Sequence, residues 1–479
     1  MPRSSYDAVI VGSGPNGLAA AIRLAQAQLA VLVLEASETV GGGTRSVELT
    51  LPGFVHDVCS AIHPLGLGSP FFRKLPLEKY GLHWVHPEFC LAHPLEGGAA
   101  VVQRRSVSET AEELGRDQGA YERLMSPLVS SWEELAWEFL QPLLHVPRHP
   151  FRLGRFGLEA MRSATSLAGS RFAEAPARAL FAGLAAHSFL PLEQKPSAAF
   201  ALVLGMLGHA VGWPMPRGGC QQIANALAAH LRSLGGEIAL NSPVRSIDQL
   251  PLARAVLLDV TPRQLLALAG HTLPDQYRLR LEKYRYGPGV FKVDYALTAP
   301  VPWKSPACAR AGTVHVGGSL EEIATGEREV GEGKHPERPF VLLAQPTLFD
   351  PLRAPQGKQI VWAYCHVPNG STFDMTESIE RQIERFAPGF RDCILARHAM
   401  RCADLEQRNV NLVGGDINGG AADLRQLVAR PVFSPAPYRT AAPGIYLCSA
   451  STPPGGGVHG MCGFHAAETV LRDMKCLGR

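Results

Sequence analysis

A glycine-rich turn near the start of the chain has the spacing of an anion-binding site. The run Gly12-Ser13-Gly14-Pro15-Asn16-Gly17 lies between a short apolar run and an Ala- and Leu-rich segment. In this spacing Gly12 allows the tight turn, Gly14 lets a pyrophosphate approach the backbone, and Gly17 lets the next helix pack on the strand. The amide groups at the start of that helix would then face an anion.

An acidic residue stands at the distance from this turn that a nucleotide site requires. Glu35 comes 21 residues after Gly14, at the end of the next apolar run. A carboxylate there can accept hydrogen bonds from ribose hydroxyls, and it favours a free 2′-hydroxyl over a 2′-phosphate. A glycine turn alone would be weak support, but turn, helix and spaced acid together predict dinucleotide binding.

Two further glycine clusters indicate that the backbone comes close to a ligand elsewhere. Gly41-Gly42-Gly43-Thr44-Arg45-Ser46 follows Glu35, and its amides and Arg45 could meet the phosphate or ribitol of a flavin dinucleotide. Gly455-Gly456-Gly457 lies between the last predicted strand and the last predicted helix, whose N-terminus would stabilise the anionic N1/O2 edge of a reduced flavin. The alternatives are a structural glycine loop and a plain tight turn.

Residues for proton transfer are few. Flavin dehydrogenation sends a hydride to flavin N5 and needs a place for a second proton, so we single out His459 and His63. A structural or pocket-lining role is the alternative for both. His56 and Asp57 with His63 give two histidines and one acid on an irregular loop, which is poor support for a metal, and none is predicted.

The elements that must position these residues follow from apolar runs. Residues 8–11, a helix over 18–26 and residues 30–34 predict a βαβ unit. Further strands are expected at 237–240, 255–258, 290–297, 341–344, 360–364 and 445–448, and further helices at 108–114, 173–186, 221–234 and from Phe464. The charged, Gly-containing segment 326–339 is expected to be a mobile loop.

Composition excludes several classes of protein. Hydrophobic residues are 46% and charged residues 19%, as in a folded globular chain, and 46 Lys plus Arg against 43 Asp plus Glu gives +3, too near neutral for a nucleic-acid partner. No two of the ten cysteines are three apart, which argues against zinc knuckles and redox disulfides. The first residues show no export signal, so a cytoplasmic location is expected.

One apolar stretch raises the question of a membrane. Residues 196–216 contain no Asp, Glu, Lys or Arg, but the apolar centre, 198–213, has 16 residues. A bilayer span needs about 20. We expect a buried helix; an element that lines a lipophilic pocket or touches a membrane surface is the alternative, so a peripheral membrane contact stays open.

The two ends of the chain resemble a known superfamily. The segment 7–45 is similar to the FAD fingerprint of the phytoene desaturase and amine oxidase superfamily. The tail is closer still: Gly414-Gly415-Asp416-Ile417, Ala429-Arg430-Pro431-Val432 and Pro454-Gly455-Gly456-Gly457-Val458 resemble bacterial phytoene dehydrogenase-like proteins. This resemblance covers about a third of the chain. Gln28 departs from it, standing where the family usually has Gly.

The resemblance implies an α/β fold in which a substrate domain is inserted into a Rossmann-like FAD-binding domain. Val244 matches the position whose backbone usually meets the adenine. We predict the FAD-binding domain at 1–75, 214–280 and 431–479, and a mixed α+β substrate domain at 76–213 and 281–430. The predicted FAD contacts are Gly12, Gly14, Pro15, Asn16, Gly17, Glu35, Ala36, Gly42, Gly43, Thr44, Arg45, Val244, Gly456, Gly457 and Val458.

These observations predict an FAD-dependent oxidoreductase that dehydrogenates a lipophilic small molecule by hydride transfer to flavin N5. Only one dinucleotide fingerprint exists, so reoxidation by oxygen or a quinone is expected rather than by a separate NAD(P)H domain. Amine oxidation, redox-neutral isomerisation on the same fold and a non-catalytic FAD-stabilised interaction protein remain alternatives. The sequence does not decide the oligomeric state.

Overall fold

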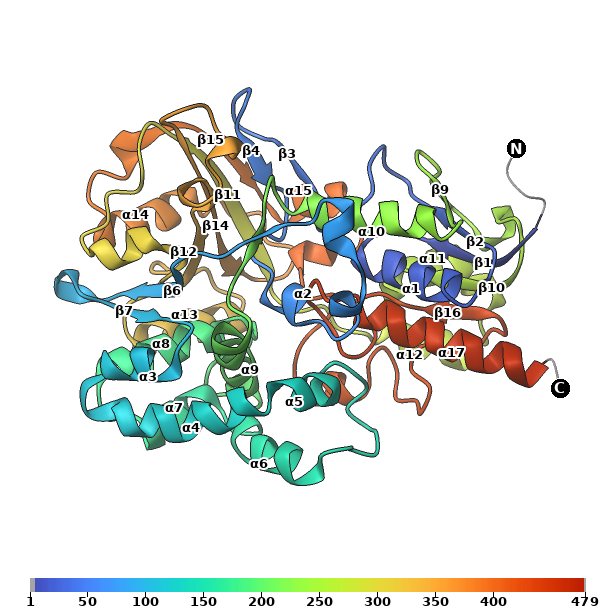
Figure 1. The fold of residues 1–479 in the computed structure, drawn as a ribbon, viewed down its shortest axis with the longest axis horizontal. Helices are drawn as coiled ribbons and strands as arrows, with labels where there is room; N and C mark the ends of the chain where they lie inside the picture. The colour runs from blue at the N-terminus through green and yellow to red at the C-terminus, as the bar shows by residue number, and fades with distance from the viewer. Residues whose placement is uncertain (1–4, 478–479) are drawn as a thin grey trace.

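Two β-sheets with different strand directions organise the computed structural model, which describes residues 5–477 (Figure 1). The first sheet is parallel throughout, with neighbouring strands in the order β16 (Ile445–Leu447), β10 (Leu252–Leu258), β1 (Ser5–Val11), β2 (Val31–Leu34) and β9 (Glu237–Ala239). Its strands read as continuous apolar runs because helices cover both faces of the sheet.

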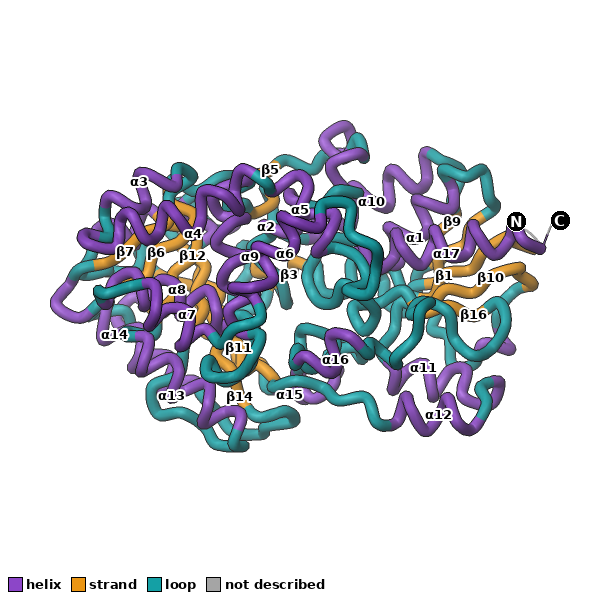
Figure 2. The backbone as a smooth tube through the Cα atoms, turned by 90° about the horizontal axis from the view of Figure 1, so that it is seen from below, coloured by secondary structure: helices purple, strands orange, loops and turns teal. Residues whose placement is uncertain are grey.

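The helices over the parallel sheet come from distant parts of the chain. In Figure 2, α1 (Pro15–Ala25), α10 (Gln221–Ser233) and α17 (Met461–Leu477) lie on one face, and α11 (Pro262–Ala269) and α12 (Asp275–Glu282) on the other. Helices α1 and α17 approach so closely that a Cβ on Gly463 would lie 1.8 Å from the Asn16 carbonyl oxygen. The C-terminal segment is therefore fixed against the first helix of the chain.

The second sheet has seven strands. Their order is β15 (Ile394–Met400), β11 (Gly289–Leu297), β14 (Gln359–Val367), β13 (Val341–Ala344), β12 (Ala311–Val316), β6 (Phe89–Pro94) and β7 (Ala100–Gln103). Neighbouring strands are antiparallel except β12 and β6, which are parallel. Helix α14 (Thr376–Phe386) packs on one face, and the other face meets a helical layer that includes α8 (Ala175–Ala186) and α9 (Ser197–Ala210).

The remaining elements connect and cover the two sheets. The helices are α2 (Pro64–Gly68), α3 (Val107–Glu112), α4 (Gln118–Ser130), α5 (Trp132–Phe139), α6 (Pro150–Ala160), α7 (Ala164–Arg171), α13 (Leu320–Gly331), α15 (Cys402–Arg408) and α16 (Leu424–Val428). The strands pair as β3 (Ser46–Glu48) with β4 (Val55–Asp57), and β5 (Trp84–Val85) with β8 (Met215–Pro216). The structure confirms the predicted α/β class, with a Rossmann-like sheet assembled from separated segments and a second mixed α+β unit.

Within the apolar stretch 196–216, residues Ser197–Ala210 form the largely buried helix α9, as expected. Within residues 5–477, no helix combines the length and the apolar character that crossing a bilayer requires. The segment 326–339 was only partly predicted correctly, because helix α13 continues to Gly331. Ser319 caps this helix by accepting a hydrogen bond from Glu322 N, and Ile323 and Val330 are buried on its inner face.

Two smaller differences concern single residues. The last helix begins at Met461 rather than at Phe464. Gln28 adopts φ 64°, the left-handed conformation that favours glycine, which accounts for the family's usual residue at this place. The domain boundaries stay a prediction.

Candidate active site

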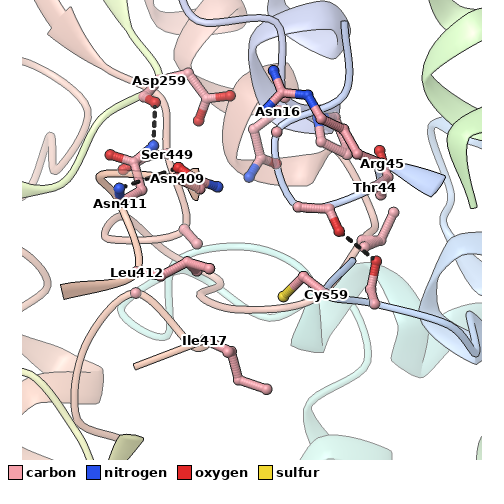
Figure 3. Close-up of a pocket in the computed structure, with 18 of the residues that line it drawn as sticks. Asn16, Thr44, Arg45, Cys59, Asp259, Asn409, Asn411, Leu412, Ile417 and Ser449 are labelled. Carbon is pink, nitrogen blue, oxygen red and sulfur yellow. Dashed lines mark hydrogen bonds between the residues drawn. The ribbon is translucent and has the colours of Figure 1, made fainter. Parts of the chain in front are cut away.

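One elongated cavity of about 700 Å³ lies between the two sheets. Its lining starts at the carboxyl ends of the parallel strands, with Val11, Leu34 and Asp259, and reaches one face of the second sheet at Trp362 and Tyr364. Figure 3 shows Asp259, Asn16 and Arg45 on one side, with Cys59 and Ile417 farther along. Ligands of open parallel sheets bind at this edge, and the volume lies within the range of cofactor and small-molecule sites.

The glycine turn has no room for side chains. Gly12 has φ 102°, a conformation that L-residues rarely adopt. A Cβ on Gly17 would lie 2.1 Å from the Gly12 carbonyl oxygen, and a Cβ on Gly14 would lie 2.7 Å from Asp259 Oδ2. The buried amide oxygen of Asn16, also in the cavity lining, has no protein partner. This cradle fits a pyrophosphate lying against the start of α1.

Glu35 is an ionised hydrogen-bond acceptor in the cavity wall. Its Oε2 accepts from Ser13 N at 3.0 Å and from Ser13 Oγ, and its Oε1 accepts from Ser37 N and from Arg45 Nη2 at 3.0 Å. Burial alone would raise the pKa of Glu35, but these hydrogen bonds and the Arg45 charge together hold it below its usual value. Arg45 therefore orients Glu35 as well as bordering the cavity.

Asp259 follows strand β10 and was not singled out by the sequence patterns. It is buried, and its Oδ2 accepts a hydrogen bond from Gly17 N at 3.0 Å. Burial raises the pKa of Asp259 to about 7; the Gly17 amide opposes this shift and the nearby Glu35 charge adds to it. The residue was missed because a lone Asp after a strand has no local spacing signal.

The structure brings together most of the predicted contacts. The predicted residues that line the cavity are Gly12, Gly14, Pro15, Asn16, Glu35, Ala36, Gly42, Gly43, Thr44, Arg45, Val244, Gly457, Val458 and His63. Gly17, Gly456 and His459 do not line it. Gly17 is turned toward Gly12 and Asp259, and Gly456 toward Asn418, so both shape the cavity from behind.

The two predicted histidines differ in their surroundings. His459 is buried in the C-terminal turn, where its Nδ1 accepts from Met461 N at 3.0 Å and its carbonyl accepts from Ser69 Oγ at 2.6 Å. His63 lines the cavity, and its buried Nε2 has no protein partner. Burial lowers the pKa of each to about 4, so both rings are neutral near pH 7. His459 therefore lies in the C-terminal turn, where its ring accepts a backbone hydrogen bond, and outside the cavity lining.

Aromatic and apolar side chains form the end of the cavity at the second sheet. The lining here is His187, Phe189, Leu204, Trp213, Thr313, Leu342, Trp362 and Tyr364. Leu342 pairs with Tyr364 across β13 and β14, and Thr313 and Trp362 both pair with Ala344, so these side chains share one face of the sheet. Among the described residues, only Glu35 and Asp259 bring carboxylates to the cavity, and both are at the nucleotide end.

A histidine pair lies at this apolar end. His187 follows α8, and its Nε2 lies 3.1 Å from Nε2 of His315 on β12. The His187 ring meets Trp213 edge-on, with 5.6 Å between ring centroids. Burial lowers the pKa of His187 to about 3, so it is a neutral polar group in an apolar wall. Residues 5–477 contain no group of three His, Cys, Asp or Glu side chains arranged to hold a metal ion.

Charged side chains are also buried beside the cavity without lining it. Arg353 Nη1 lies 2.9 Å from Asp57 Oδ2, and Lys292 pairs with Asp294. Asp57 also accepts from Ser46 Oγ and Cys220 N, which tie β3 and β4 to the start of α10. The Arg353 charge and these hydrogen bonds outweigh burial and hold the pKa of Asp57 below its usual value. This cluster joins the two units of the fold.

Comparison with known proteins agrees with this geometry. A rat protein called pyridine nucleotide-disulfide oxidoreductase domain-containing protein 2 is 26% identical, over 99% of this chain and 94% of its own. A lycopene-forming phytoene desaturase of Paracoccus is 24% identical over 58% of this chain and 59% of its own. An oxidoreductase of Methanosarcina mazei has the same fold, with TM-score 0.66 and 17% identity, over 97% of this chain and 99% of that one.

The sequence profile of the flavin-containing amine oxidoreductases matches residues 16–266, more than half of the chain. That range includes the first glycine turn from Asn16, Glu35 and Asp259, all of which border the cavity or its cradle. The match begins at Asn16, so Gly12 and Gly14 precede it, while Gly17 and the residues that surround the cradle from Glu35 to Asp259 lie within it. The chain belongs to the flavin-containing amine oxidoreductase family and is an FAD-dependent oxidoreductase.

Proposed function

We propose that the chain dehydrogenates a lipophilic small molecule, forming a C=C bond, and is reoxidised by oxygen or a quinone. The observation that carries this proposal is the apolar, aromatic end of the cavity, where the described lining contains no carboxylate. A polycationic substrate would enter that end without a counter-charge, which is costly in a buried site. The phytoene desaturase relative supports the same substrate class.

Bound FAD supplies the hydride acceptor, and the chain's own residues hold it and the substrate. In this proposal the glycine cradle, Glu35 and Val244 bind the adenosine and pyrophosphate part, and Gly457 and Val458 border the ring. His63, or His187 at the apolar end, accepts the second proton on a neutral nitrogen. His459 keeps the C-terminal turn in shape, because its ring nitrogen accepts a backbone hydrogen bond.

The test is anaerobic mixing of the holoprotein with candidate substrates while the flavin absorbance is followed. We expect bleaching by an apolar isoprenoid dispersed in detergent, and recovery of the oxidised spectrum when oxygen or a quinone is admitted. His63→Gln and His187→Gln should slow bleaching without changing the FAD content, while Glu193→Gln, at an exposed ion pair with Arg328, should change neither. Bleaching by amines alone, with an aldehyde and an amine or ammonia as products, would contradict the proposal.

Amine oxidation is the second candidate, and membership of the flavin-containing amine oxidoreductase family supports it. The cavity offers aromatic rings at Trp213, Trp362 and Tyr364, which suit a lipophilic amine better than a polyamine. In the same bleaching assay, a panel of arylalkyl amines and diamines would distinguish oxidation of a lipophilic amine from oxidation of a polyamine. Redox-neutral isomerisation would give product under anaerobic conditions without net bleaching, and a purely FAD-stabilised interaction protein would give neither.

A membrane contact also belongs to this proposal, and the exposed segment 143–161 supports it. Val146 and Phe151 are each 91% exposed and Leu158 is 78% exposed, although all three are large apolar residues. The neighbouring guanidinium groups of Arg148 and Arg155 are exposed and, within the described chain, form no ion pair. The segment 143–161, which includes helix α6, therefore presents an apolar and basic outer face, the chemistry that binds an anionic lipid surface. A lipophilic substrate would be supplied from such a surface.

A further inference from the structure

Asp259 lines the cavity beside the glycine turn at the start of α1. Its carboxyl group is held by Gly17 N, the second amide of the first turn of α1 that can donate, and lies beside the Gly14 Cα. Figure 3 shows the carboxyl pointing into the cavity toward Asn16. Among the described residues, only Oδ2 of Asp259 has a protein partner, so the other oxygen is free to face the space that the cavity lining encloses.

This position is where the pyrophosphate of a bound dinucleotide must pass. Glu35 and Val244 border the cavity on the adenosine side, and Gly457 and Val458 border it on the ring side. Asp259 lies against the glycine turn, where helix α1 begins. A pyrophosphate crossing the start of α1 therefore comes within reach of its carboxyl group.

The charges around Asp259 do not suit an anionic carboxylate next to a second anion. Within residues 5–477, no Lys or Arg forms an ion pair with Asp259, and Glu35 is ionised nearby. The groups that face it from β16 and α17 are Cys448 and Cys462, whose thiols remain neutral because burial raises their pKa values. The Gly17 amide is thus the only described donor that favours the charged form.

We propose that Asp259 binds the cofactor as a neutral carboxylic acid, which accepts the Gly17 N–H at one oxygen and donates its O–H to a pyrophosphate oxygen from the other. The proton comes from the solvent whenever Asp259 is ionised in the free protein, and it returns to the solvent when FAD leaves. No bond of FAD changes in this step. The inference rests on FAD binding and is independent of the proposed substrate.

The proposal gives a definite sign to the effect of pH. Burial raises the pKa of Asp259 in the free protein to about 7. Above that pH the free carboxyl group is ionised, so FAD binding must include the uptake of a proton by Asp259. For one proton, FAD affinity should be about 50-fold weaker at pH 9 than at pH 7, and nearly flat below pH 6. The other titratable groups of the lining do not change charge between pH 6 and 9: Glu35 stays ionised, His63 and His187 neutral, and Cys59 has a pKa raised by burial to about 11.

The experiment is dissociation of FAD from the holoprotein on dilution at pH 6 to 9, followed by the fluorescence of the released flavin. Asp259→Asn keeps an acceptor for Gly17 N and a permanent donor for the pyrophosphate, so its FAD affinity should not change with pH. Glu380→Gln is the matched control, because Glu380 is another carboxyl whose pKa burial raises, on α14 away from the cavity lining. It should keep the wild-type pH dependence. Equal pH slopes in wild type and Asp259→Asn would overturn the proposal.

A second measurement needs no variant. At pH 8 in weak buffer with an indicator dye, release of FAD from the wild-type holoprotein should release about 0.9 proton per flavin, the ionised fraction of a group with a pKa of about 7. Release of no proton would also overturn the proposal. Neither measurement depends on catalysis, so failure here is distinguishable from failure of the proposed dehydrogenation.

Discussion

Gly14→Ala tests whether FAD binding requires the space between Gly14 and the Asp259 carboxyl group at the start of α1. Gly14 has φ −65° and ψ 169°, which any residue adopts, so the substitution introduces no backbone strain. The new Cβ would lie 2.7 Å from Asp259 Oδ2, and the carboxyl group must move away. Its hydrogen bond to Gly17 N at 3.0 Å is then lost.

The free-energy cost arises from the Gly17 N–H, which is left without an acceptor. A buried N–H without an acceptor costs about 1–3 kcal/mol, which corresponds to a loss of about 5- to 150-fold in FAD affinity if the loss falls on the bound state. The assay is FAD content after purification and the dissociation constant from flavin fluorescence. Gly17→Ala should bind far less FAD, because its Cβ would lie 2.1 Å from a backbone oxygen that has no freedom to rotate.

Two comparisons separate this explanation from a general loss of folding. Gly169→Ala, on a helix with nothing within 4 Å of the new Cβ, should bind FAD as the wild type does. Gly14→Ala should lower FAD affinity no further when it is added to Asp259→Ala, since the colliding carboxyl is already gone. Wild-type FAD affinity in Gly14→Ala, or an equal further loss when Gly14→Ala is added to Asp259→Ala, would refute the reasoning.

Three other predictions concern different parts of the molecule. Arg353→Met should lower the free energy of unfolding by about 3–5 kcal/mol in urea titrations, because it leaves the buried Asp57 without its ion pair, whereas Arg338→Met at an exposed position should not. The free energy of unfolding should fall as the pH drops from about 6.5 toward 4, because burial lowers the pKa values of His63, His459 and His465 to about 4. Between these pH values the three rings take up protons only in the unfolded chain, which costs the folded state about 2 kcal/mol each at pH 5. A rise in stability over that range would contradict this prediction. Phe151→Glu with Leu158→Glu should reduce flotation with anionic vesicles, whereas Leu352→Glu, at an equally exposed leucine elsewhere, should not; unchanged flotation in the α6 variant would exclude that surface.

The nucleotide half of the cavity could be predicted because its signals are local. The positive φ of Gly12, the close approach at Gly17 and the carboxylate of Glu35 all lie within one βαβ unit, where spacing along the chain fixes spacing in space. Asp259 belongs to the same place, but it arrives from a strand that enters the sheet more than two hundred residues later. Nothing in its own neighbourhood indicates that it will face the Gly17 amide.

The substrate half depends on pairing that sequence patterns do not specify. Thr313, Leu342, Trp362 and Tyr364 come from three strands, and they share a face only because the register aligns Leu342 with Tyr364 and both Thr313 and Trp362 with Ala344. A shift of one residue in any strand would turn its side chain to the opposite face and change the lining. Periodicity identified the strands β13 and β14, yet it could not choose which face meets the cavity, because both faces of this sheet are buried. The lining of the nucleotide end is therefore set mainly by contiguous motifs, and the lining of the apolar end by a register that distant segments determine together.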